Sequence, residues 1–281
     1  MEAMEVYEKI RRVRRAGRPT AQDYINAIFK NFTELHGDRR FADDKAVVGG
    51  VAWLGNEPVT VIGIEKGHSI DERMSRNFGC ASPEGYRKAM RLAKQAEKFH
   101  RPVVCFVDTQ GANPGAGAEE RGQGQAIAEN LYELMTLKTP VVSIVIGEGG
   151  SGGALALAVA DRVWMLENAY YSVVSPEGCA SILFKDATRA PEAAAHLKLT
   201  AEDLLSMEII EEIIREPDDF TSKEAAAGVM KELRKMLEKT LHTLQKASTE
   251  ELLAARYEKY RKIGRPAEEA PAPKKARSTR K

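Results

Sequence analysis

The chain of 281 residues is long enough for one large domain or two small ones, and its 43% hydrophobic and 30% charged residues are ordinary for a globular protein. The formal net charge of +1 gives no indication of a nucleic acid partner, although the stretches RRVRRAGR (11–18) and KKARSTRK (274–281) are basic. No apolar run reaches the roughly 18 residues of a membrane span, and the charged N-terminus lacks the apolar core of a signal peptide, so we expect a cytoplasmic protein.

The first hundred residues change from a helical to an extended pattern and back. Residues 1–16 predict a short charged helix, and the apolar spacing from Thr20 to Gly37 predicts a second helix. KAVVGGVAWL and PVTVIGIEKG, on either side of the turn residues 55–56, predict an antiparallel pair of strands. HSIDERMSRNFGCA predicts a loop, and Ser82 followed by Pro83 begins a helix that ends near His100.

From residue 102 onward, buried strands alternate with helices, which indicates an α/β fold. PVVCFVD and PVVSIVI each precede a glycine-rich segment and a helix, so 102–138 and 140–160 form two similar units. DRVWMLE predicts another strand, AYYSVVSPEG a strand and a turn, and the chain from Thr188 is mainly helical. The predicted domains are an N-terminal helical segment (1–40), an α/β core (41–217), C-terminal helices (218–262) and a disordered basic tail (263–281).

The segment that bears most directly on function is VVSIVIGEGGSGGALALAVA (141–160). Five glycines occupy seven positions there, between a strand and a helix. One interpretation is a dinucleotide fingerprint, in which Gly147, Gly149 and Gly152 form Gly-x-Gly-x-x-Gly and Glu167 contacts the ribose. Against it, only about eight residues separate Gly152 from the next strand, and a Rossmann crossover needs more.

A second interpretation is a nucleophile elbow. Ser151 stands in Gly-x-Ser-x-Gly, with Asp186 and His196 downstream in the order of an α/β-hydrolase triad. Nothing in the sequence shows that these three side chains meet. A Walker A loop is excluded, because no Gly-Lys-Ser/Thr follows the glycines.

A third interpretation is a site for an anion built from backbone amides. The free N–H groups and the dipole at the start of a helix favour a developing negative charge, which is the physical basis of an oxyanion hole. The glycine-rich segment DTQGANPGAG (108–117) follows the neighbouring strand and would form a second wall of the same crevice. Tight packing of a small-residue helix would explain the first set of glycines but not the second.

Five stretches of the sequence resemble the carboxyltransferase alpha subunits of bacterial acetyl-coenzyme A carboxylase, and they occur in the order that this family has. The resemblance extends over roughly residues 20–262 and is carried by ADDKAVVGG (42–50), RNFGCASPEGYRKA (76–89), FVDTQGANPGAGAEERGQ (106–123), IGEGGSGGALA (146–156) and YSVVSPEGCASIL (171–183). It implies that the core, 41–217, has a crotonase-like fold of repeated ββα units. It also implies transfer of a carboxyl group from carboxybiotin on a carrier protein to acetyl-CoA, giving malonyl-CoA for fatty acid synthesis.

The resemblance also implies the site and the partners. The backbone amides of Gly152 and Gly153 would be the catalytic donors to the ureido oxygen of biotin, and a side chain at either position should block the close approach. The carboxybiotin site would be lined by Gly111, Ala112, Gly149 and Gly150. A beta subunit that carries zinc and binds the acyl-CoA would complete an α2β2 assembly, and the biotin carboxyl carrier protein and biotin carboxylase would join the larger complex.

Some residues differ from the family or lack an assigned role. Gln110 and Asn113 stand where the family more often has Pro and Tyr, which bears on the shape of the glycine-rich loop. Lys66, Arg73 and Arg76 either meet coenzyme phosphates or, as is commoner, are surface charges. The three cysteines are far apart, which argues against a zinc site in this chain, and no Met-Lys-Met biotinylation sequence or ATP-binding loop is present.

Overall fold

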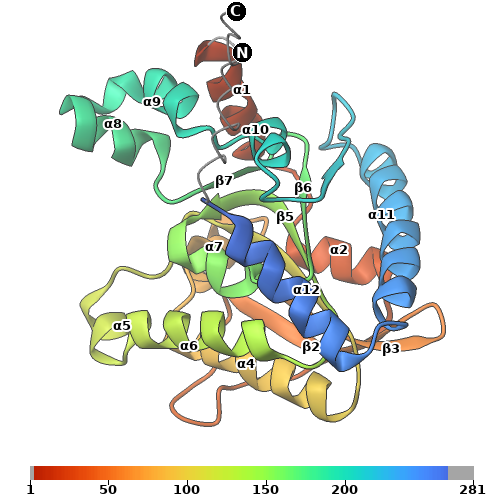
Figure 1. The fold of residues 1–281 in the computed structure, drawn as a ribbon. Helices are drawn as coiled ribbons and strands as arrows, with labels where there is room; N and C mark the ends of the chain where they lie inside the picture. The colour runs from red at the N-terminus through yellow and green to blue at the C-terminus, as the bar shows by residue number, and fades with distance from the viewer. Residues whose placement is uncertain (1–2, 265–281) are drawn as a thin grey trace, which may run out of the picture.

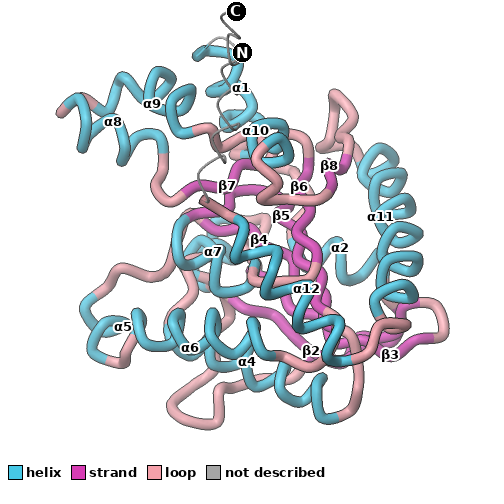
Figure 2. The backbone as a smooth tube through the Cα atoms, in the orientation of Figure 1, coloured by secondary structure: helices cyan, strands magenta, loops and turns pink. Residues whose placement is uncertain are grey.

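An eight-stranded β-sheet forms the centre of the protein in the computed structural model, which describes residues 3–264 (Figures 1 and 2). The strands are β1 Lys30–Glu34, β2 Val47–Leu54, β3 Glu57–Ile64, β4 Val103–Thr109, β5 Val141–Gly150, β6 Arg162–Leu166, β7 Tyr170–Ser172 and β8 Glu212–Ile214. Their order is β1-β2-β3-β4-β5-β6-β8, with β7 beside the end of β5. The first three strands are antiparallel and the others parallel, so this is a mixed α/β sheet.

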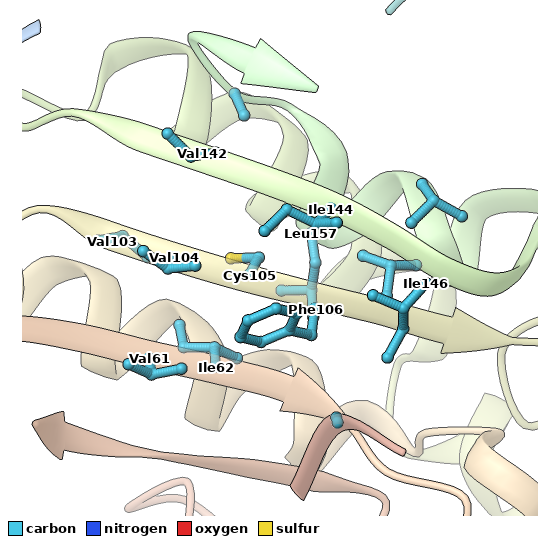
Figure 3. Close-up of a cluster of buried hydrophobic side chains, with 14 of the residues drawn as sticks. Val61, Ile62, Val103, Val104, Cys105, Phe106, Val142, Ile144, Ile146 and Leu157 are labelled. Carbon is cyan, nitrogen blue, oxygen red and sulfur yellow. The ribbon is translucent and has the colours of Figure 1, made fainter. Parts of the chain in front are cut away.

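The central strands are buried on both faces. All ten residues of β5 are buried, as is most of β4, and their branched apolar side chains make the continuous runs that parallel strands require. Figure 3 shows Val104 and Phe106 of β4 beside Ile144 and Ile146 of β5 in this core. Two parallel strands that end side by side bring the segments that follow them to one edge of the sheet.

Helices cover both faces of the sheet (Figure 1). One face carries α4 Pro83–Lys98, α6 Gln123–Thr136 and α7 Ser151–Ala158, with α12 Thr249–Lys262 against α6, and the other carries α2 Ala21–Ile28 and α11 Lys223–Leu244. At the top of the view, α8 Pro176–Phe184 and α9 Ala190–Leu197 pack on each other and extend from the body beside α1 Ala3–Val13. Short helices complete the fold: α3 Ile70–Ser75, α5 Ala116–Glu120, α10 Ala201–Ser206, and 3-10 turns at Asn77–Gly79 and Ala187–Arg189.

The helix predicted from Thr20 to Gly37 is wrong in its second half. The helix ends at Ile28, and 30–34 form strand β1, which pairs with the free edge of β2. Gly50 permits this pairing, because a Cβ there would lie 2.0 Å from the carbonyl oxygen of Thr33. Pairing of 30–34 with β2 therefore decides the structure of this segment, against the helical pattern of its own residues.

Other local predictions are corrected by capping and pairing. The predicted loop after Gly67 contains α3, whose start is fixed by a capping box between Ser69 and Glu72. The predicted turn at Pro176 begins α8, because Ser175 caps its N-terminus. Sequence analysis also missed α5 and β8, the latter a three-residue strand held by β6.

The remaining elements confirm the sequence analysis. The strand pair joined at 55–56, the helix begun by Ser82 and Pro83, the units 102–138 and 140–160 and the two C-terminal helices are all present. The basic tail lies outside the described residues from 265 onward. In residues 3–264, no helix has both the length and the apolar character needed to cross a bilayer.

Candidate functional site

The two glycine-rich segments meet where β4 and β5 end. The backbone of 110–112, directly after β4, lies across Gly150 and Gly153 at the start of α7. A Cβ on Gly150 would lie 2.1 Å from the carbonyl oxygen of Gln110, and one on Gly153 would lie 2.5 Å from the nitrogen of Ala112. Both positions need glycine because one backbone touches another there.

The glycines before Ser151 are not in a loop, as sequence analysis assumed, but in the buried end of β5. A Cβ at Gly149 would lie 2.8 Å from the carbonyl oxygen of Tyr170 in β7, and one at Gly147 would overlap the carboxylate of Asp108. Gly149 therefore leaves room for strand β7, and Gly147 leaves room for the carboxylate of Asp108. The exposed part of the motif begins at Ser151.

Gly152 differs from Gly153 in its surroundings. Gly153 is buried, whereas Gly152 is partly exposed, and a Cβ on it would make an ordinary contact of 3.5 Å with Cγ2 of Ile127. The expectation that a side chain at either position blocks the close approach therefore holds by geometry only for Gly153. The first amides of α7 have no carbonyl partner within the helix, and no side chain caps them in the described part of the chain.

The loop that faces this helix end is fixed by its own side chains. The hydroxyl of Thr109 accepts a hydrogen bond from the N–H of Gly111 (3.0 Å) and donates one to the Gly111 carbonyl (2.8 Å). The N–H of Gly111 is thus already used. Gly111 has φ +150° and open space where a Cβ would point, so the outer surface of this turn is bare backbone. The N–H of Asn113 donates to Ala81 (2.9 Å), which anchors the far side of the turn.

The structure does not assemble the hydrolase site. Ser151 is exposed and has φ +53°, but within residues 3–264 no hydrogen bond joins it to Asp186 or His196. Asp186 instead accepts hydrogen bonds from Thr188 near the start of α9. The dinucleotide interpretation also fails on contacts, because Glu167 pairs with Arg215.

A partly buried charge network, with Glu148 at its buried centre, lies beneath the loop on the side of α1 and α2. The Lys66 ammonium pairs with Asp108 (2.7 Å) and Glu148 (2.8 Å), and Arg14, directly after α1, pairs with Glu148 (2.9 Å). Glu148 also accepts from the hydroxyl of Tyr170 (2.8 Å). Lys66 is committed to these carboxylates, so a role in binding coenzyme phosphates does not suit it.

The other two basic residues considered in the sequence are held by backbone carbonyls. Arg73 donates to Gly67 (3.2 Å) and Arg76 to Lys45 (2.8 Å). Sequence analysis missed the network itself. Its available signal was the pair of acidic residues at the ends of adjacent strands, Asp108 in FVDTQG and Glu148 in IGEGG.

We predict that Glu148 makes folding sensitive to acid. Burial would raise the pKa of Glu148, but Lys66, Arg14 and the Tyr170 hydroxyl lower it from 4.5 to about 2. Because the folded-state pKa is the lower one, the stabilisation is complete above pH 4.5 and is lost as the pH falls toward 2. Between pH 7 and pH 3, the free energy of unfolding should fall by on the order of 2 kcal/mol more in the native protein than in Glu148→Gln.

Urea titrations of both proteins at the two pH values measure this difference. Equal losses of unfolding free energy in the two proteins would show that Glu148 is not held ionised by the network.

The mixed sheet, the helices on both of its faces and the paired glycine segments make up a crotonase-like fold. The chain superimposes on transcarboxylase 12S, solved as a hexamer with methylmalonyl-coenzyme A and methylmalonic acid bound, with a TM-score of 0.60 and 19% sequence identity. The match covers 76% of this chain and 41% of the transcarboxylase chain. At this identity, the likeness concerns the fold.

The family follows from the sequence as a whole: the chain belongs to the acetyl co-enzyme A carboxylase carboxyltransferase-like family, whose model matches residues 1–264. It is 58% identical over 264 residues to the carboxyl transferase subunit alpha of acetyl-coenzyme A carboxylase from Ruminiclostridium cellulolyticum, which covers 93% of this chain and 98% of that protein. It is also 58% identical to a protein of Natranaerobius thermophilus named as subunits beta/alpha, covering 92% of this chain and 43% of that longer protein. The resemblance stated from the motifs is confirmed.

Proposed function

We propose that this chain is the alpha subunit of an acetyl-CoA carboxylase carboxyltransferase, which transfers a carboxyl group from carboxybiotin on a carrier protein to acetyl-CoA. The observation that carries the proposal is the contact of the 110–112 backbone with the N-terminus of α7 at Gly150 and Gly153. In a chain of this family, that contact builds a site from backbone groups without a reactive side chain.

The chain's own contribution to the reaction is placement and electrostatics. Carboxybiotin supplies the carboxyl group and a ureido nitrogen that can take the proton from the acetyl methyl group. The backbone amides of Gly152 and Gly153, at the start of α7, donate to the ureido oxygen of biotin, where negative charge develops when the carboxyl group leaves. The dipole of α7 favours the same charge. The turn at Gly111 and Ala112 forms the opposite wall. Gly150 contacts that wall from within the sheet, and Gly149 pairs with Thr109, the residue that leads into it.

The acyl-CoA side of the site belongs, in this proposal, to a separate beta subunit in an α2β2 assembly. The fused relative named as subunits beta/alpha supports such a partner, because both parts occur there in one chain. Within the described residues, no group of three or more His, Cys, Asp or Glu side chains could hold a metal ion. The zinc of the assembly, as the family resemblance implies it, belongs to the beta subunit in this proposal. The carrier protein and biotin carboxylase supply the carboxybiotin.

The experiment is the reverse reaction, in which malonyl-CoA and a free biotin derivative yield acetyl-CoA. It is run with this chain alone, with the beta subunit alone and with both. Activity that needs both chains supports a shared site. Full activity of the beta subunit alone would leave this chain as a scaffold, and biotin-independent hydrolysis of malonyl-CoA by this chain would restore the hydrolase hypothesis.

We predict that Ser151→Ala has a small effect on carboxyl transfer, less than about threefold, because the proposed donors are main-chain amides that the substitution keeps. The side chain is exposed at the beginning of α7 and has no triad partner within residues 3–264. Steady-state rates of the reverse reaction with and without the substitution test this. A loss of several hundredfold with unchanged melting temperature would point to a nucleophilic serine.

A further inference from the structure

One buried hydroxyl near the two glycine segments has no hydrogen bond among the described residues. Tyr86 of α4 is fully buried, and its hydroxyl has no partner among the described residues. Burial raises the pKa of Tyr86, so the hydroxyl keeps its proton and is a donor at neutral pH. An unsatisfied buried hydroxyl lowers the stability of the folded state, so its presence calls for another explanation.

The Tyr86 hydroxyl points at the contact between the two glycine segments. A Cβ built on Gly153 would lie 2.9 Å from this hydroxyl, 2.7 Å from the carbonyl carbon of Gly111 and 2.5 Å from the nitrogen of Ala112. Because all three groups lie within 3 Å of one point beside Gly153, the hydroxyl lies close to the Gly111–Ala112 peptide. It belongs to the wall of the proposed site, seen from the side of α4.

Several polar groups of the turn 110–113 already have partners. Thr109 holds both polar groups of Gly111, and the amide nitrogen of Gln123 donates to the carbonyl of Asn113 (3.0 Å). The carbonyl oxygen of Gly111 accepts one hydrogen bond from Thr109, and a carbonyl oxygen has two lone pairs. One acceptor position on the Gly111–Ala112 peptide is therefore free, and the buried Tyr86 hydroxyl close to this peptide is without an acceptor.

We propose that Tyr86 is a positioning residue for carboxyl transfer, whose hydroxyl donates to the Gly111 carbonyl when the substrates press the turn against α7. Two hydrogen bonds to that carbonyl polarise the peptide and fix the direction of the Ala112 N–H. Tyr86 touches no reacting atom in this role. The inference rests on the proposed carboxyltransferase function, because it gives the turn a task in that reaction.

The test is Tyr86→Phe in the complete assembly with the beta subunit, followed by the reverse reaction and by thermal unfolding. We expect kcat to fall by about tenfold or more, as for loss of a group that orients a donor, with KM for malonyl-CoA within about twofold of the native value. The melting temperature should stay equal or rise, because the substitution removes an unsatisfied buried hydroxyl. Lower activity together with undiminished stability is the signature of a positioning role.

Tyr24→Phe is the matched control. Tyr24 is also fully buried with an unpartnered hydroxyl, but it lies in α2 and stacks on Phe106 at 5.4 Å between ring centroids. It is on the other face of the sheet, so its substitution should leave kcat unchanged. A Tyr86→Phe assembly with native kcat, or one that loses kcat only in proportion to a lowered melting temperature, overturns the inference while leaving the proposed function intact. If the native assembly transfers no carboxyl group, the proposed function fails and the inference fails with it.

Discussion

Replacement of Gly153 by valine is expected to reduce carboxyl transfer by at least about 100-fold, the loss typical of removing a donor from an oxyanion site. The reason is steric. Even the first atom of the new side chain would lie 2.5 Å from the nitrogen of Ala112 and 2.7 Å from the carbonyl carbon of Gly111. Both are backbone atoms, so the 110–112 turn or α7 has to move as a unit. The 110–112 turn, which forms one wall of the site, then separates from the amides at the start of α7 that it faces.

Three smaller substitutions separate this effect from a general loss of folding. Gly153→Ala should already impair the reaction, whereas Gly152→Ala should fold normally, because its Cβ makes only an ordinary contact with Ile127. Gly228→Ala in α11 is the neutral control, since nothing lies within 4 Å of its Cβ. Alanine also suits a helix interior better than glycine, so this variant should be slightly more stable.

Size-exclusion chromatography with the beta subunit and the rate of the reverse reaction are the two measurements. If Gly153→Val assembles normally and keeps native activity, the chemistry lies in the partner and this chain serves as a scaffold.

The parts of the fold that could be predicted are those with a local physical signal. The strand pair around 55–56 has alternating and branched residues on either side of turn residues, and α4 has a capping serine followed by proline. Strand β1 had no such signal. Its residues continue the helical spacing of α2, and only pairing with the edge of β2, where Gly50 lies opposite Glu34, makes them extended.

The candidate site likewise has a part that could be predicted from the sequence and a part that could not. The glycine pattern predicted two glycine-rich segments at one edge of the sheet, but only the structure shows that Gly150 and Gly153 admit the backbone of the turn while Gly152 has room for a side chain. Lys66 illustrates the limit for charged residues. A lysine near a glycine-rich loop suggests a phosphate ligand, and nothing in the sequence shows that Asp108 and Glu148 already neutralise it.

The C-terminal helix α12 is held to the sheet by a buried ion pair. The guanidinium of Arg256 is fully buried and donates to both carboxylate oxygens of Asp161, at 2.8 Å and 2.7 Å. It also donates to the carbonyls of Leu134 and Leu137, both at 2.7 Å. Asp161 in turn accepts from the N–H of Val141 at the start of β5 (2.7 Å). One side chain thus joins α12, the end of α6 and the strand that leads into the site.

We predict that Arg256→Met lowers the free energy of unfolding by about 3–5 kcal/mol, because it leaves the Asp161 carboxylate buried without a cation. Arg256→Met combined with Asp161→Asn should recover a large part of this loss. The neutral amide carries no buried charge, and its oxygen still accepts from Val141. Arg261→Met, at an exposed position on the same helix, is the control and should change stability by less than about 0.5 kcal/mol.

Urea unfolding of the native protein, Arg256→Met, Asp161→Asn and the double variant gives the coupling energy between the two sites. Arg261→Met is measured alongside them as the control. The effect should reach the site, because Tyr260 of the same helix donates to the carbonyl of Ala158 (3.0 Å) at the far end of α7. If α12 moves away from the domain, the C-terminus of α7 loses its hydrogen bond from Tyr260. The donor amides at the N-terminus of α7 then belong to a helix that is less well fixed. We therefore expect Arg256→Met to lose carboxyl transfer at temperatures where the assembly remains folded. Native activity up to the melting temperature would show that α12 stabilises the domain without supporting the site.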